Sequence, residues 1–379
     1  MHLDNLLIFY QNCGGLKTKI TQLKLNLLTC EYDVIILVET WLSSAVFDSE
    51  IKADSYLMFR RDRNLNLTDK KGGGGLLILV KKNINVLRRF DLEANNIEEI
   101  YLHFPCYSDL LLCACYIPPA SKSTMFDRFF CKLHDVHLNG HFSNLMLIGD
   151  FNLPYLKWLS DCPSPHPVVS DTDISKLLTY TMALLNLHQF NTILNENSRT
   201  LDLVFSTSRH ITVNTAEDPL LNLVPHHPPL EILHSACNRE PHMSTFNDHK
   251  IKRNFFKADY ELINKDLCNI NWTSELATLS PELAVDKFYN LLNDIIEKHV
   301  PQTKSKPPRY PNWFSKSLIS TLRRKTKVWM RWKTYGSLRD YQEFDLLRKR
   351  VKLLIRNCYN LYIENIEKSL KDNIKLFWK

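Results

Sequence analysis

Seven short apolar runs divide the first 205 residues of this 379-residue chain, and they carry apolar side chains on both faces. The runs lie at 6–10, 34–38, 75–80, 100–104, 110–117, 144–148 and 201–205. A run of this length between turn-forming residues is typical of a buried β-strand, and strands that are apolar on both faces need cover on both sides. Helical patterns at 19–29 and 174–187 can supply that cover. The pattern therefore predicts a layered α/β sandwich rather than a small barrel.

Polar side chains stand at the ends of several of these predicted strands. Asn12 follows the first run, Glu39 the second and Tyr116 closes the fifth, while Asp150 and Asn152 follow the sixth. A carboxylate in such a place can hold a cation or orient a water molecule, and an amide can donate to a phosphoryl oxygen. A single strand-end polar residue is usually incidental. Their recurrence favours one site for metal-assisted attack on a phosphate.

Asp202 differs from these residues because it lies inside an apolar run, 201–205. A carboxylate there is costly to bury without a hydrogen-bonding or ionic partner. We therefore expect a partner for Asp202 in the fold.

Glycines are expected to shape the backbone near two of the strands. Gly149, just before Asp150, is expected to let the chain turn sharply. Gly72–Gly75 could suggest a phosphate-binding loop, but no Lys-Ser/Thr pair follows it. A flexible turn into the strand at 75–80 is the preferred interpretation.

Charge is distributed unevenly along the chain. Residues 301–379 carry 20 Lys and Arg against 6 Asp and Glu, while residues 1–300 carry 28 against 35. A basic tail behind an acidic body points to an anionic partner, with nucleic acid the leading candidate and a solvated helix surface the alternative. We expect a first domain at 1–234, a connecting segment with helices and a Pro-rich linker at 235–311, and a basic helical segment at 312–379.

Two groups of basic residues are the candidate nucleic-acid contacts. In the tail, aromatic residues that could stack on bases or fill a helix–helix core interleave with basic ones. In the first domain, a basic loop either touches the DNA backbone or is solvated. The candidates are Arg323, Arg324 and Lys325 in the tail and Arg60, Arg61, Arg63, Lys70 and Lys71 in the loop.

The ten cysteines show no CxxC pair and no metal-ligand spacing. They indicate a reduced, intracellular protein. No apolar run is long enough to span a bilayer and no signal peptide is evident, so we expect no membrane partner.

The motifs around these residues, taken together, resemble a known superfamily. They are Gln-Asn12-Cys-Gly-Gly, Val-Glu39-Thr-Trp, Cys-Tyr116-Ile-Pro-Pro, Gly-Asp150-Phe-Asn152 and Thr-Leu-Asp202-Leu-Val-Phe. In this order they look like the endonuclease/exonuclease/phosphatase superfamily, and more narrowly like the apurinic-type endonuclease domain of non-LTR (LINE-type) retrotransposons, particularly Jockey-like elements. The resemblance covers roughly residues 5–234. It implies a four-layer α/β sandwich, two packed mixed β-sheets flanked by helices, here with a helical basic C-terminal extension.

The resemblance also implies a role for each site residue. Glu39, with Asn12 beside it, would bind a divalent cation, normally Mg²⁺ with Mn²⁺ as an alternative. Asp150 would orient or deprotonate the attacking water, while Asn152 and Tyr116 would hold the phosphate. Asp202 would support the site, and His227 would complete it.

One position departs from the family pattern. The family usually places Asp one to three residues before the histidine, whereas this chain reads Leu223-Val-Pro-His-His227. Without a carboxylate the imidazole loses orientation and part of its tendency to stay protonated. A weakened or decayed site is therefore one expectation for this chain.

The function expected from the resemblance is Mg²⁺-dependent nicking of one DNA strand to leave a 3′-hydroxyl, as in target-primed reverse transcription. The alternatives are a catalytically decayed nucleic-acid-binding protein, a phosphatase or phosphodiesterase of the same superfamily, and an abasic-site repair enzyme. RNA is a second candidate ligand of the tail. No Phe/Tyr-x-Asp-Asp polymerase signature is present, so the reverse transcriptase module is expected to be absent. A nuclear location is expected from the substrate and from basic stretches such as 348–350.

Overall fold

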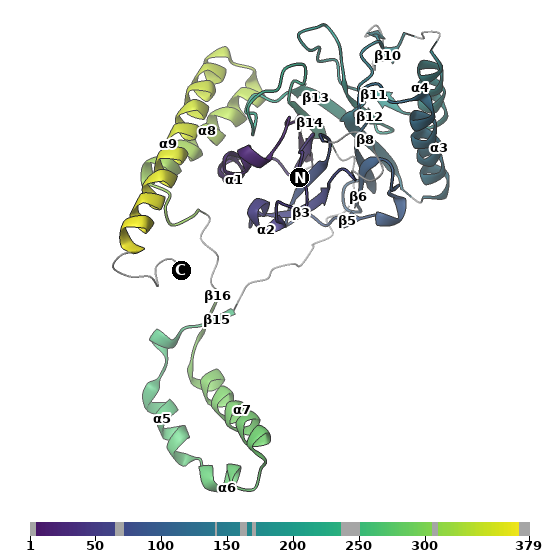
Figure 1. Cartoon of the computed structure of the whole chain (residues 1–379). Coiled ribbons are helices and arrows are strands. Elements are labelled where there is room, and N and C mark those ends of the chain that lie inside the picture. Colours follow the sequence, from purple (N-terminus) through teal and green to yellow (C-terminus); the bar gives the residue numbers. More distant parts are fainter. Residues whose placement is uncertain are drawn as a thin grey trace. The chain divides into compact units, whose positions relative to one another are not determined.

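The computed structural model describes residues 5–64, 72–140, 142–159, 165–168, 172–235, 251–304 and 310–370. The chain forms two compact units (Figure 1). One consists of Met1–Ser244 together with Asn312–Lys379, and the other of Thr245–Pro311. The first and last parts of the chain therefore build one body. The division into segments at 1–234, 235–311 and 312–379 stays a prediction.

Two six-stranded mixed sheets form the centre of the larger unit. The first has the order β13-β14-β1-β2-β4-β3 and the second β11-β12-β8-β7-β6-β5. Each contains one parallel pair, β1 with β2 and β7 with β8. The strands of the first sheet are β1 Leu6–Asn12, β2 Val34–Val38, β3 Tyr56–Arg61, β4 Leu76–Lys81, β13 Ile211–Thr215 and β14 Leu230–His234. Those of the second are β5 Leu87–Arg88, β6 Glu98–Phe104, β7 Leu110–Tyr116, β8 Asn144–Asp150, β11 His188–Gln189 and β12 Asp202–Ser206.

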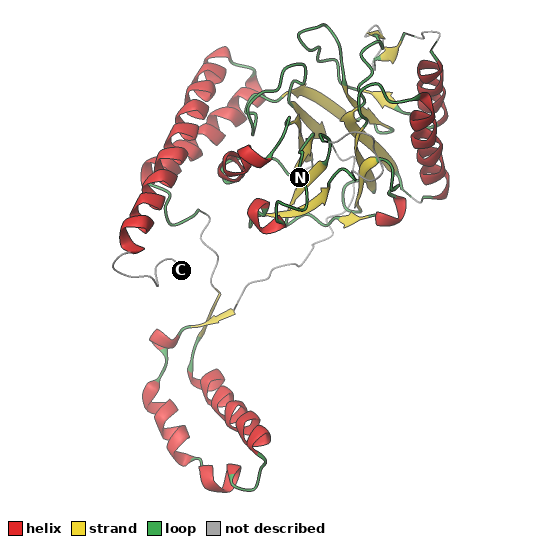
Figure 2. Cartoon of the chain, viewed as in Figure 1, coloured by secondary structure: helices red, strands yellow, loops and turns green. Residues whose placement is uncertain are grey.

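Helices cover the outer face of each sheet (Figure 2). The first sheet is covered by α1 Ile20–Leu27 and α2 Asp48–Ile51, and the second by α3 Ser123–Asn139 and α4 Asp173–Leu184. Short elements in the connections are η1 Lys17–Lys19, η2 Phe90–Leu92, β9 Trp158–Leu159 and β10 His166–Pro167. Apolar side chains fill the space between the sheets and the two spaces beneath the helices. The predicted four-layer α/β sandwich is confirmed.

Strand register brings the predicted site residues to one edge of the sandwich. Asn12 pairs with Val38 in the parallel pair β1–β2, so Glu39 follows directly beside it. Asp150 lies opposite Tyr116 across β7–β8 and opposite Asp202 across β12–β8. The ends of strands from both sheets therefore supply one cluster of polar groups.

Gly149 serves a different purpose from the one expected. It lies within β8, paired with Cys115 on β7 and with Leu203 on β12, and the chain does not turn there. A Cβ at this position would stand 2.1 Å from the carbonyl oxygen of Cys115. Glycine is needed because the neighbouring backbone approaches closely. The turn comes later, at Asn152, whose φ is 50°.

The C-terminal helices form an antiparallel hairpin that is part of the larger unit. They are α8 Lys316–Tyr335 and α9 Leu338–Leu370, joined at Gly336, which takes the left-handed conformation with φ 66°. Phe344, Leu347, Val351 and Ile355 of α9 are buried. Leu361, further along the same helix, is 59% exposed.

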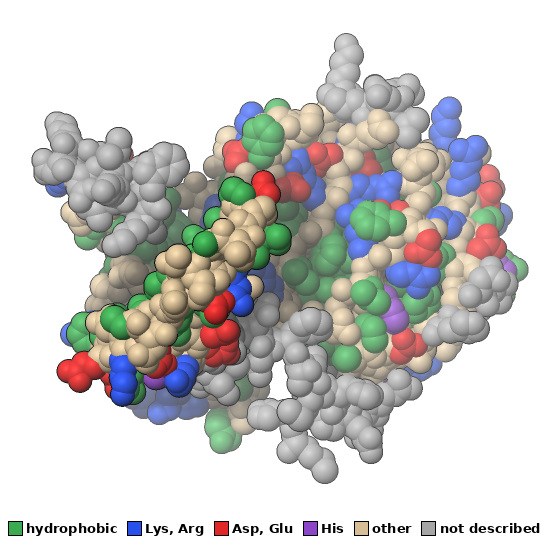
Figure 3. All heavy atoms as spheres, turned by 90° about the horizontal axis from the view of Figure 1, so that it is seen from below, with side chains coloured by type: hydrophobic (Ala, Val, Ile, Leu, Met, Phe, Trp, Pro, Cys, Tyr) green, Lys and Arg blue, Asp and Glu red, His purple; other side chains and the backbone are tan. Residues whose placement is uncertain are grey.

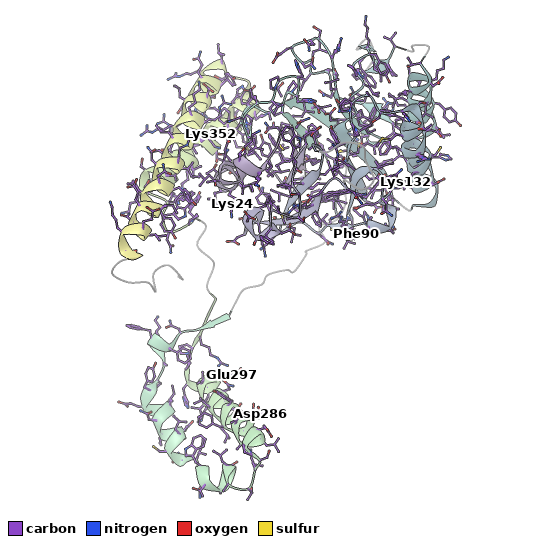
Figure 4. The ribbon with its side chains drawn as sticks, in the orientation of Figure 1. Lys24, Phe90, Lys132, Asp286, Glu297 and Lys352 are labelled. Carbon is purple, nitrogen blue, oxygen red and sulfur yellow. The ribbon has the colours of Figure 1, made fainter. Side chains whose placement is uncertain are left out.

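Basic side chains of this hairpin bind acidic side chains of the sandwich. Asp218 forms ion pairs with Lys325 and Lys352, at N···O distances of 3.3 Å and 2.8 Å. Glu231 forms an ion pair with Lys333 at 2.6 Å. Figure 4 labels Lys352 on the side of α9 that faces the sandwich. The basic hairpin is therefore held on an acidic surface of its own chain. On the face shown in Figure 3, the described basic and acidic side chains are interspersed.

The smaller unit is a helical motif closed by a two-stranded ribbon. Its elements are β15 Ile251–Arg253, η3 Phe255–Lys257, α5 Tyr260–Asn269, α6 Trp272–Leu276, α7 Pro281–His299 and β16 Gln302–Lys304. Its buried apolar residues are Ile263, Ile295 and Val300. Among the helices of the described residues in either unit, none is both long and apolar enough to cross a bilayer.

Candidate active site

Asp150 and Asn152 are held in one tight turn at the end of β8. The Asn152 backbone N–H donates to Asp150 Oδ1 at 3.0 Å, and the Asn152 side-chain amide donates to the carbonyl oxygen of Ile117 at 2.9 Å. The left-handed backbone at Asn152 is a conformation that asparagine tolerates better than most residues. Acid and amide are therefore fixed at the same edge, as the sequence predicts.

The carboxylate of Asp202 has two partners, which the sequence led us to expect without identifying them. The Tyr10 hydroxyl donates to Oδ1 at 2.7 Å, and His227 Nδ1 lies 2.9 Å from Oδ2. Asp202 and Tyr10 are buried. The expectation that His227 lacks a carboxylate is therefore wrong. The acid comes from a neighbouring strand, 25 residues away in the sequence, instead of from the preceding residues.

The loop that carries His227 is fixed in a similar way. His226 has a φ of 68°, and the His227 N–H donates to the carbonyl oxygen of Val224 at 3.3 Å. Asn195 Nδ2 donates to the His226 carbonyl oxygen at 3.1 Å. The imidazole of His227 is thus held by both its backbone and its Asp202 partner.

Electrostatics set the protonation of His227. Burial alone would lower the pKa of His227, but the hydrogen bond and charge of Asp202, with smaller effects from Asp150 and Glu39, raise it to about 9. The imidazole is therefore a cation at neutral pH, with Nε2 3.8 Å from Asp150 Oδ2. A protonated imidazole can stabilise negative charge that develops on a phosphate.

Burial and nearby negative charge act together on the carboxyl group of Asp150. Burial, followed by the nearby charge of Asp202, raises the pKa of Asp150 to about 8, and Glu39 adds to the effect. A carboxyl group with such a pKa is poised to exchange a proton near neutral pH.

Glu39 follows directly after β2. Its φ is 57°, and its Oε2 accepts the Gly74 N–H at 2.7 Å together with the Trp41 indole N–H. Tyr116 is a further hydrogen-bond partner; burial, followed by this bond to Glu39, raises the pKa of the phenol. Gly72–Gly75 is thus more than a turn, because it supplies a donor to Glu39.

The group fits a hard divalent cation. Asn12 Nδ2 donates to Asp150 Oδ2 at 3.2 Å, which places the amide between Asp150 and the end of β2. Three acidic side chains, those of Glu39, Asp150 and Asp202, lie near one imidazolium, and each acts on its pKa. Carboxylate and amide oxygens are the donors that Mg²⁺ and Mn²⁺ accept.

Asp150, Asp202 and His227 each offer an atom within 4.8 Å of the others and could themselves hold a metal ion. That arrangement requires a neutral imidazole, because a protonated one has no lone pair to give. With a pKa of about 9, His227 is mainly a cation in the metal-free protein. That Glu39 and Asn12 hold the cation stays a prediction.

The arginines of the predicted basic loop are used inside the protein. Arg60 binds Asp62 and Asp48, Arg61 binds Glu93, and Arg63 binds Glu98. None of the three is exposed. These contacts favour a structural role over the predicted one of contacting DNA. Lys70 and Lys71 lie outside the described residues.

In the hairpin, the three predicted contacts differ from one another. Lys325 is 6% exposed and bound to Asp218, so it holds the hairpin on the sandwich and is not available as a nucleic-acid contact. Arg324 forms an exposed pair with Glu343 at 2.6 Å. Arg323 is exposed, and its contact with nucleic acid stays a prediction.

Several residues of the site were not identified from the sequence. Tyr10, Trp41, Gly74 and the Arg63–Glu98 pair all contact a predicted site residue or its loop. An aromatic hydroxyl inside the apolar run at 6–10 was the one available signal for Tyr10. The contacts to Glu39 depend on loop geometry that a residue pattern does not encode.

Similar structures exist among solved proteins. The endonuclease domain of TRAS1, a telomere-specific non-LTR retrotransposon, is 14% identical and matches 61% of this chain and 99% of its own with a TM-score of 0.45. AP endonuclease LMAP from Leishmania major is 12% identical and matches 62% and 88% with a TM-score of 0.44. The human Nocturnin catalytic domain is 15% identical and matches 62% and 94% with a TM-score of 0.42. The sequence matches no protein-family model and no curated protein.

Proposed function

We propose that this protein is a metal-dependent phosphodiester hydrolase that nicks one strand of DNA and leaves a 3′-hydroxyl. The observation that carries the proposal is the buried Asp202–His227 pair beside Asp150, with Glu39 and Asn12 next to them. It supplies a cation ligand, a group to orient water and a cationic group for the phosphate in one place.

Each side chain has a role that its surroundings support. Glu39 and Asn12 would hold the cation, Mg²⁺ or Mn²⁺, which when bound polarises the phosphate and neutralises its charge. Asp150 orients the attacking water and takes its proton, since its pKa of about 8 lies near the working pH. His227, kept protonated by Asp202, donates to the phosphoryl oxygen.

Asn152 and Tyr116 complete the proposed site. The Asn152 amide uses one hydrogen for the carbonyl oxygen of Ile117, and its second hydrogen remains for a phosphate oxygen. Tyr116 stays a neutral phenol, because burial and Glu39 raise its pKa, and a neutral phenol can donate.

A catalytically decayed nucleic-acid-binding protein is the weaker candidate. Its main support was the missing acid beside His227, and Asp202 now occupies that role at 2.9 Å. A phosphatase or a phosphodiesterase for small molecules remains a rival, because one fold can host several reactions. Substrate comparison separates these classes.

The test is nicking of supercoiled plasmid by the purified chain, with Mg²⁺ and with EDTA. We expect Mg²⁺-dependent nicking that Glu39→Gln reduces by at least about 100-fold, because a cation ligand is lost. Glu50→Gln, an exposed acid on α2, is the matched control and should leave the rate unchanged. If the folded protein hydrolyses a small phosphate ester but leaves plasmid intact, it is a phosphatase and the proposal of an endonuclease is wrong.

We further propose that the nick is one that a polymerase can extend, as the retrotransposon resemblance implies. Nicked plasmid should then support primer extension without prior phosphatase treatment. A nuclear location follows from a DNA substrate, and fluorescence microscopy of the tagged chain tests it. Diffuse signal throughout the cell would contradict that location without affecting the nicking result.

A further inference from the structure

A buried ion pair stands directly behind the Glu39 side of the site. Arg63, just after β3, donates from Nε to Glu98 Oε1 on β6 at 2.6 Å. Both residues are only 8% exposed. Because β3 belongs to the first sheet and β6 to the second, the pair joins the two sheets at the edge where the site lies.

The pair also binds both ends of the glycine loop. Arg63 Nη1 donates to the Gly72 carbonyl oxygen at 2.5 Å, and the Gly75 N–H donates to Glu98 Oε2 at 2.5 Å. A Cβ at Gly74 would stand 2.4 Å from both Arg63 Nη2 and Glu98 Oε2. The loop is therefore folded closely around the ion pair, and only glycine fits at Gly74.

The glycine loop contacts the Glu39 carboxylate, and Tyr116 is a second partner of the same carboxylate. Gly74 N–H donates to Glu39 Oε2 at 2.7 Å. The Arg63 guanidinium lies 5.5 Å from the centre of the Tyr116 ring, and Tyr116 stands opposite Glu98 across β6–β7. Gly74 and Tyr116, two of the three partners of the Glu39 carboxylate, thus lie against the same ion pair.

We propose that the Arg63–Glu98 pair is a positioning device for Glu39. It fixes Gly72–Gly75 and Tyr116, and through them it holds the Glu39 carboxylate in the orientation in which it binds the cation. The effect on cation binding rests on the proposed function, in which Glu39 is a cation ligand. The effect on the glycine loop is independent of that function. Outer partners of this kind commonly change metal affinity by about 10- to 100-fold when removed.

The experiment uses the full chain labelled with ¹⁵N-glycine, which is practical because the sequence has nine glycines. Hydrogen exchange of the Gly74 amide is measured without metal, and its chemical shift is then followed during Mg²⁺ titration. Arg63→Lys keeps the charge but loses the planar guanidinium, and Glu98→Gln keeps the shape but loses the charge. Arg60→Lys is the matched control, because Arg60 is also a paired arginine and lies three residues earlier, in β3.

We expect Gly74 exchange to be at least about 10-fold faster and the Mg²⁺ midpoint about 10- to 100-fold higher in Arg63→Lys and Glu98→Gln, and both unchanged in Arg60→Lys. Wild-type exchange and midpoint in a folded Arg63→Lys or Glu98→Gln protein would overturn the proposal. Absence of a Mg²⁺ response in the wild type would refute the metal site of the proposed function, while the exchange rates would still decide whether the pair positions the loop.

Discussion

Replacing Asp202 by Asn tests whether this carboxylate keeps His227 charged. The substitution retains the size of the side chain but removes the negative charge 2.9 Å from Nδ1. Since Asp202 is the main group that raises the pKa of His227 to about 9, the pKa should fall toward its ordinary value. At pH 8 the protonated fraction would drop from about nine-tenths to about 3% at a pKa of about 6.5, a loss of about 30-fold.

The pH dependence of nicking is the direct measurement. Asp202 also raises the pKa of Asp150, so its removal should make Asp150 a base at lower pH. Initial rates at saturating Mg²⁺ between pH 5.5 and 9.5 should give a bell-shaped profile whose two limbs both move toward acid in Asp202→Asn. Near pH 6 the variant should lose much less activity than at pH 8.

Asp109→Asn is the matched control for this experiment. Asp109 forms a similar pair with His103, at 2.7 Å, on the connection between β6 and β7 and away from the site. This change should leave the profile unmoved. An alkaline limb that stays in place in Asp202→Asn would refute the assignment of that limb to His227.

Three further predictions concern stability. Lys325→Ala should lower the free energy of unfolding by about 1–2 kcal/mol, because it leaves the half-buried Asp218 with one partner fewer. Arg324→Ala, in an exposed pair, should cost under about 1 kcal/mol, and urea titration of both variants checks this. Gly149→Ala should destabilise the fold by about 1–3 kcal/mol or more, because its methyl group presses on the carbonyl oxygen of the adjacent strand, and wild-type stability would contradict this. Metal-free protein should lose thermal stability as the pH rises from 5 to 9, because folding raises the pKa values of Asp150 and His227. The stability that each protonated group contributes is full below its unfolded pKa and is lost above its folded pKa, about 8 for Asp150 and about 9 for His227. Mg²⁺ should therefore raise the melting temperature more at pH 8.5 than at pH 6, and an equal rise at both would argue against the site.

The layers of the sandwich could be predicted because each strand is apolar on both faces. The runs at 34–38 and 144–148, for example, became β2 and the start of β8, fully covered by helices and by the opposite sheet. The strand-end residues were also recognisable, because a polar group directly after a buried strand must emerge at its edge.

The contacts between distant segments could not be predicted in the same way. Asp202 lies on β12 of the second sheet and His227 in the loop before β14 of the first, so their contact depends on how the two sheets pack, which no local pattern specifies. The residues next to the histidine therefore gave no indication that Asp202 is its partner. The excess of lysines in the tail gave no indication that some of them bind acids of the same chain. Gly149 was expected to form a turn, but it is needed because two backbones approach closely there. Both situations select glycine, so the sequence alone does not distinguish them.

The attachment of the C-terminal hairpin has a consequence for how the chain is made. Asp218 precedes its partner Lys325 by 107 residues. At a synthesis rate of 5–20 residues per second the ribosome needs roughly 5 to 20 seconds to add that stretch. Asp218 is therefore made at least that long before Lys325 can pair with it.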